Sequence, residues 1–127
     1  MIRVMHIKPD AYRAMFREDA TPDFPHDFET VAIVATESED HAFRLTNHVD
    51  SPWWENPLVV RYKPESRSTS VGDVMMLLEL DGVRFLRCAP AGWEEMDVNV
   101  SLALAHAVFS ERTALTRKTL VTVERIA

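Results

Sequence analysis

The stretch from Arg67 to Glu95, RSTSVGDVMMLLELDGVRFLRCAPAGWEE, decides the fold class of this chain. Asp81-Gly82 lies at its centre between two apolar runs, a pattern that is typical of a β-hairpin. The three glycines of the chain, Gly72, Gly82 and Gly92, all fall in this stretch, and we expect them at three sharp turns. The pattern therefore predicts two paired strands with a tight turn between them.

Both faces of the predicted hairpin are apolar. With the turn at Asp81-Gly82, Leu80 pairs with Val83, and the following pairs alternate between the two faces. One face then carries Met76, Leu78, Leu80, Val83 and Phe85, and the other carries Met75, Leu77, Leu86 and Cys88. Because a half-solvated ribbon would be polar on one side, we expect packing on both. The sequence predicts an α+β fold, with a small, mainly antiparallel curled sheet or partial barrel around the central 74–88 hairpin and two or three helices.

Further elements are expected on either side of the hairpin. The patterns predict strands over residues 2–8, 28–36, 58–62 and 119–126, and helices over residues 11–18, 37–48 and 99–112. Asp10 is expected to cap the first helix, and Thr36 with Glu39 has the spacing of a capping box for the second. Residues 98–112 also alternate as a strand would, but their alanines favour a helix.

The size and composition indicate one domain spanning residues 1–127, with a hydrophobic fraction of 46% that is ordinary for a globular protein. A single cysteine excludes an intramolecular disulfide and is typical of a reducing compartment. The sequence shows no signal-peptide pattern and no apolar run of membrane-spanning length. We therefore expect a soluble, cytoplasmic protein without a membrane partner. The net charge of −6 disfavours nonspecific binding to nucleic acid.

Two loops carry the residues that we expect to bind a partner. The candidate binding residues are Trp53, Trp54, Glu55 and Asn56 in the first loop, and Arg67, Ser68, Thr69 and Ser70 in the second. Exposed tryptophans are enriched at binding hot spots and can stack on bases, whereas in the alternative both rings anchor their loop to the core. The hydroxyls and the guanidinium of the second loop could cradle an anion or hydrogen-bond within their own turn.

No catalytic residue, metal ligand or cofactor site is predicted. His41 and His48 would share one face of the 37–48 helix, and Asp50 or Glu55 could add a carboxylate, but this spacing matches no established zinc pattern. The second loop lacks the glycines and the lysine of a P-loop. A hydrolase would require polar groups to converge in one pocket, and the candidates are His48, Asp50, Asp73 and Glu94.

Four phrases resemble a family of small uncharacterised bacterial and phage proteins. They are LTNH at 45–48, PWWEN at 52–56, RSTSVGD at 67–73 and GWEE at 92–95. The SVGD hairpin followed by a Gly-aromatic-Glu-Glu segment is also similar to YodL-like domains of plasmid and phage polyvalent proteins. This resemblance covers residues 43–96 and implies a mobile-element or host-conflict context. It supplies no catalytic residue to transfer to this chain.

Three functions follow from these patterns. The first is a non-enzymatic regulator or inhibitor that docks on a protein partner through the two loops. The alternative is a nucleic-acid or nucleotide-binding module, distantly like PUA or ASCH domains, in which Arg61, Lys63, Arg67 and the tryptophans line a cleft. The second alternative is a small hydrolase. The acidic charge and the lack of a coherent catalytic constellation favour the first.

Overall fold

A computed structural model describes residues 1–117, so the strand predicted over 119–126 lies outside the described residues. Within these residues seven antiparallel strands form one open sheet in the order β6-β5-β4-β1-β2-β3-β7. The strands are β1 Ile2–Ile7, β2 Phe28–Val34, β3 Val59–Tyr62, β4 Val74–Glu79, β5 Gly82–Ala89, β6 Gly92–Glu95 and β7 Thr116–Arg117. The helices are α1 Pro9–Arg17, α2 Glu39–Leu45 and α3 Val100–Ala114, with a 3-10 turn η1 at Trp53–Glu55. The predicted α+β class is confirmed.

The β4–β5 hairpin forms as predicted, but its turn is one residue earlier. Glu79 pairs with Gly82, so Leu80 and Asp81 make the turn. Gly82 follows the turn with φ +149°, a backbone angle that favours glycine, and the next hairpin likewise places Gly92, at φ +91°, after its turn. Each residue therefore pairs with a residue two positions from its predicted partner, so every side chain stays on its predicted face of the hairpin. Leu80 was expected on a packed face but is fully exposed at the turn, and Leu78 on the same face is 43% exposed.

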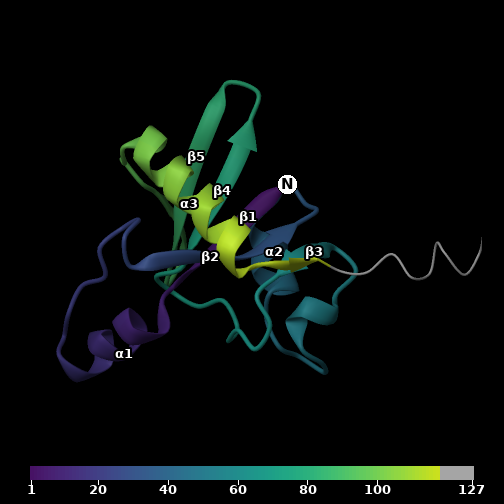
Figure 1. Ribbon diagram of the computed structural model, residues 1–127, viewed down its shortest axis with the longest axis horizontal. Coiled ribbons are helices and arrows are strands. Elements are labelled where there is room, and N and C mark those ends of the chain that lie inside the picture. The colour runs from purple at the N-terminus through teal and green to yellow at the C-terminus, as the bar shows by residue number, and fades with distance from the viewer. Residues whose placement is uncertain (118–127) are drawn as a thin grey trace, which may run out of the picture.

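β1 is the middle strand of the sheet, paired with β4 on one side and β2 on the other. The hairpin therefore occupies one half of the sheet and projects beyond the rest of the molecule, as Figure 1 shows. β6 adds a third strand to the two that were predicted in this region. The end of β1, the start of β2 and the segment after β3 are brought together around the middle of the sheet.

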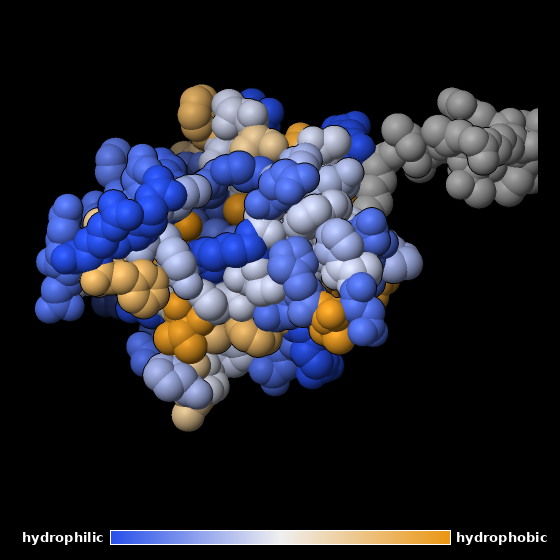
Figure 2. Space-filling view, turned by 90° about the horizontal axis from the view of Figure 1, so that it is seen from below, coloured by the Kyte–Doolittle hydropathy of each residue, from blue (hydrophilic) through white to orange (hydrophobic). Residues whose placement is uncertain are grey.

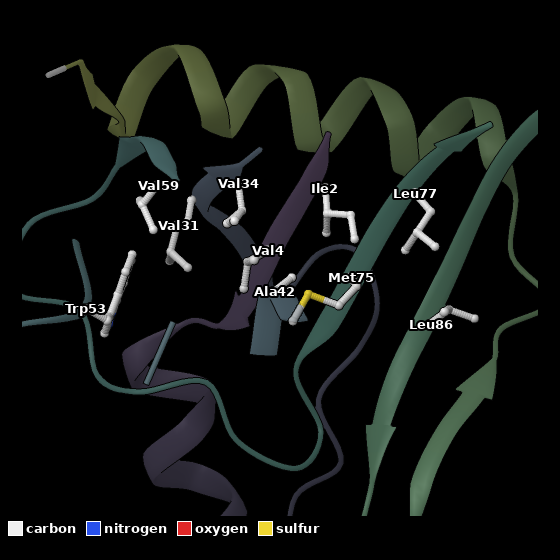
Figure 3. Packing of buried hydrophobic residues seen from close by; sticks show 11 residues of the cluster. Ile2, Val4, Val31, Val34, Ala42, Trp53, Val59, Met75, Leu77 and Leu86 are labelled. Carbon is white, nitrogen blue, oxygen red and sulfur yellow. The ribbon is translucent and has the colours of Figure 1, made fainter. Parts of the chain in front are cut away.

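The sheet has an apolar cluster on each face. The cluster facing α2 and η1 contains Ile2, Val4, Val31, Val34, Ala42, Trp53, Val59, Met75, Leu77 and Leu86 (Figure 3). The cluster facing α3 contains Met5, Ile7, Phe28, Val74, Met76, Phe85, Ala103 and Ala107. Alternate residues of β1 and β4 thus enter different clusters, which explains why the hairpin is apolar on both faces. Within residues 1–117 no helix is long and apolar enough to cross a membrane.

The helix boundaries correct several details of the sequence-based prediction. α1 begins at Pro9, since proline suits the first helical turn, and Asp10 lies inside that turn instead of capping it. The cap of α2 is Ser38, whose hydroxyl accepts a hydrogen bond from the His41 amide, and not Thr36. α2 ends at Leu45, so it stops before His48. α3 is a helix as preferred, capped by the Asn99 side chain.

Candidate functional site

The two loops that were predicted to bind a partner lie side by side, and Trp53 joins them. Its indole Nε1 donates hydrogen bonds to the carbonyl oxygens of Ser66 (3.1 Å) and Arg67 (3.0 Å). Nearby, the His48 amide donates to the Ser68 hydroxyl at 2.8 Å. Trp53 is only 2% exposed, so its ring anchors the first loop to the core. For Trp53 the alternative to an exposed binding role is therefore the correct one.

Asp73 organises the second loop from inside the protein. Its carboxylate is 1% exposed and accepts hydrogen bonds from both terminal nitrogens of Arg67, at 2.6 and 2.8 Å. It also accepts from the backbone amides of Ser70 (2.8 Å) and Ile7 (3.0 Å). The guanidinium of Arg67 in turn lies over the ring of Tyr12, 4.1 Å from its centroid. Asp73 therefore fixes the loop to β1 and holds Arg67 against α1.

His6 lies beside this carboxylate in the buried part of the site. Its Nε2 is 2.8 Å from the hydroxyl of Thr69, which is itself 2.7 Å from the hydroxyl of Thr46. Burial lowers the pKa of His6 from 6.5 to about 4, although Asp73 opposes the shift. The imidazole is therefore neutral at neutral pH. Thr69, a predicted binding residue, is buried in this network.

We expect the protein to lose stability as the pH falls, because His6 must take up a proton on unfolding. Its pKa is lower in the folded than in the unfolded state, so the stabilisation is complete above pH 6.5 and is lost as the pH falls towards 4. Between about pH 7.5 and about pH 5 this amounts to roughly 2 kcal/mol of unfolding free energy. Urea unfolding at both pH values measures the change. His6→Asn should reduce it and the exposed His26→Asn should not; equal changes in all three proteins would contradict this role of His6.

A cavity of about 290 Å³ opens next to this network, between α1, the end of β1 and the loop after β3. It is lined by His6, Ile7, Pro9, Tyr12, Arg13, Glu29, Val31, Lys63, Glu65, Ser66 and Arg67. The walls are largely apolar, and charges of both signs surround them. Figure 2 shows the molecule from below, where hydrophilic residues dominate the surface and apolar residues are visible between them. A cavity of this size and character is suited to a small group or a single side chain.

The cations around the cavity are already paired. Lys63 contacts Glu29 at 2.7 Å, and Arg13 forms an ion pair with Asp10. Arg67 is held by Asp73, as described above. Arg61 does not reach this cavity: it lies under α3, where it pairs with Glu111 at 3.1 Å. The cleft of Arg61, Lys63 and Arg67 that the nucleic-acid hypothesis required is therefore not formed.

The remaining predicted residues are divided between the surface and the loop interior. Trp54 is partly buried and packs edge-on against Trp53 and His48. Glu55 and Asn56 line a second cavity of about 330 Å³, which Trp53 also lines. Ser68 and Ser70 make hydrogen bonds within the loop region.

The hypothetical metal and hydrolase sites are not assembled. His41 and His48 do not share a helix; the first contacts Thr36, and the second accepts a hydrogen bond from the Trp53 amide. In the part of the chain that the structure describes, no three His, Cys, Asp or Glu side chains are grouped to hold a metal ion. Asp50 and Glu94 line different cavities. The carboxylate of Asp73 is buried and paired with Arg67. The four hydrolase candidates therefore do not converge in one pocket.

Sequence reasoning missed His6 and Tyr12 as parts of the site. His6 is a polar residue between the apolar residues Met5 and Ile7 of β1, which was an available signal, since a buried polar side chain needs a partner. Tyr12 lies in the helix predicted over residues 11–18, and no local pattern indicated that its ring would contact Arg67, 55 positions later in the sequence.

No protein-family model, curated protein or solved structure matches this chain. The resemblance of residues 43–96 to phage and plasmid proteins therefore stays a prediction. The function is argued below from the geometry of the site.

Proposed function

We propose that this protein is a non-enzymatic regulator or inhibitor that binds a protein partner, with the cavity beside α1 as the centre of the contact surface. The observation that carries this proposal is the combination of apolar walls with a rim of both charges. Ile7, Tyr12 and Val31 supply the apolar walls, while Arg13 and Glu65 are exposed at the rim. Such a site suits an apolar or aromatic side chain of a partner whose neighbours carry charge.

The pairing of the cations favours a protein over a nucleic acid as the partner. A phosphate backbone is bound chiefly by unpaired lysines and arginines, whose charge releases counterions. Here Lys63 and Arg67 each have a carboxylate partner, so binding a phosphate would first break an ion pair. A protein surface can instead complement charges of both signs. The mobile-element or host-conflict context implied by the resemblance suits a small inhibitor of this kind.

A pull-down with rim variants tests the proposal. Arg13→Glu reverses a charge at the cavity, whereas Arg17→Glu makes the same change on the same helix away from it. We expect wild type and Arg17→Glu to capture the same protein from host lysate, and Arg13→Glu and Glu65→Arg to capture on the order of tenfold less. Mass spectrometry of the captured proteins measures the difference. Equal capture by all four proteins would contradict the proposed surface.

The nucleic-acid alternative has a separate readout. We expect no binding of a labelled single-stranded oligonucleotide at low salt, measured by fluorescence anisotropy. Binding that weakens steeply as salt is added and is lost in Arg13→Glu would support the alternative and overturn the protein-binding proposal.

A further inference from the structure

The outer face of α3 is unusually apolar for a surface helix. Ala103, Ala107 and Ser110 point towards the sheet and are buried. The opposite face presents Ser101, Leu102, Ala105, Val108, Phe109 and Arg112. A helix with one face in solvent normally carries charged residues there, yet from residue 100 to residue 110 α3 has none.

Two large side chains on this face are left in water. Leu102 is 59% exposed and Phe109 is 68% exposed. Beside them lies a largely apolar groove lined by Ser101, Leu104, Ala105, Val108, Phe109 and Arg112. The helix therefore presents protruding apolar groups and a depression on the same surface.

We propose that the outer face of α3 is a homodimer interface, in which the α3 helices of two copies pack antiparallel across a two-fold axis near Ala105. A two-fold interface requires one surface to complement itself, so residues equally far from 105 on either side must face each other. Phe109 then meets Ser101 of the second copy, and Leu102 meets Val108. Each large side chain faces a smaller one, and Ala105 against Ala105 permits helix axes about 8 Å apart.

The charges at the two ends of the face fit the same arrangement. The side chains of Asp97, just before α3, and Arg112, near its end, form no ion pair or hydrogen bond with any other residue from 1 to 117. Residue 112 faces residue 98 of the second copy in this geometry, which brings Arg112 next to Asp97. The two-fold axis creates this pair twice, since each copy supplies one acid and one base. Charge complementarity thus points to a second copy as the occupant, and this inference is independent of the proposed partner site beside α1.

The test is the molar mass of the full chain in solution, measured by sedimentation equilibrium from low to high micromolar concentration. We expect wild type to approach twice the mass of one chain. Phe109→Glu should raise the dissociation constant by about a hundredfold or more. Leu80→Glu introduces the same charge at a fully exposed leucine on the hairpin turn and should leave the dimer intact. Circular dichroism confirms that each variant is folded.

A charge exchange separates this geometry from other ways of pairing. Asp97→Arg and Arg112→Asp should each weaken the dimer about tenfold, and the double variant should restore it. A wild type that is monomeric at every concentration would overturn the proposal and leave the face to another occupant, such as residues 118–127 or a different protein. A dimer that Phe109→Glu does not weaken, or that the double variant does not restore, would also overturn it.

Discussion

Asp73→Asn is expected to lower the free energy of unfolding by about 3 kcal/mol, a large part of the total for a domain of this size. The amide that replaces the carboxylate cannot satisfy Arg67, Ser70 and Ile7 together, because one of its two polar atoms is a donor. The guanidinium of Arg67 would lose its partner while remaining partly buried. Urea unfolding at neutral pH measures the loss.

Asp10→Asn is the matched control for this change. Asp10 also pairs with an arginine, but its side chain is exposed, so the variant should cost no more than about 0.5 kcal/mol. If Asp73→Asn were as mild as Asp10→Asn, the loop would not depend on the buried carboxylate. The conformation of residues 67–70 would then have to be stabilised by other contacts.

Trp53→Ala is expected to destabilise the fold by about 3–5 kcal/mol, because it removes a fully buried ring from the apolar cluster that faces α2 and η1. It also removes the donor that binds the carbonyl oxygens of Ser66 and Arg67. Trp53→Phe keeps most of the ring and should cost less. Thermal and urea unfolding compare the variants.

Trp54→Ala provides the contrast, because Trp54 is only partly buried and its indole makes no hydrogen bond within residues 1–117. We expect a loss of about 1–2 kcal/mol. A variant lacking both tryptophans should therefore fail through unfolding, and its loss of binding would say nothing about a binding role. Trp53→Ala and Trp54→Ala with equal, small effects would show that η1 is not an anchor of the loops.

The hairpin shows how far local pattern extends. The alternation of Met75, Met76 and Leu77 specified which residue enters which cluster, since successive side chains of a strand point to opposite faces. The turn position was wrong by one residue, because the dipeptide signal does not specify whether the glycine lies in the turn or just after it.

The candidate site shows where the local pattern ends. The sequence singled out Arg67 and the tryptophans by residue type, and these residues do lie in neighbouring loops. The sequence did not reveal their roles. Trp53 becomes an anchor only when η1 packs on the sheet, and Arg67 lines a cavity only when the buried Asp73 holds it there. Contacts between residues 60 or more positions apart, such as Ile7 with Asp73, depend on the strand order.

The sequence by itself determined the α+β class and the two apolar faces of the hairpin, because each depends on periodicities within a few residues. The periodicity of residues 98–112 fitted both a strand and a helix, and only the alanines favoured the helix that α3 forms. Only the tertiary structure decided that β1 is the middle strand, that Arg61 lies on the other face from Lys63 and Arg67, and that His6 is buried beside Asp73. Strand order and burial result from packing the whole chain, and no local pattern encodes them.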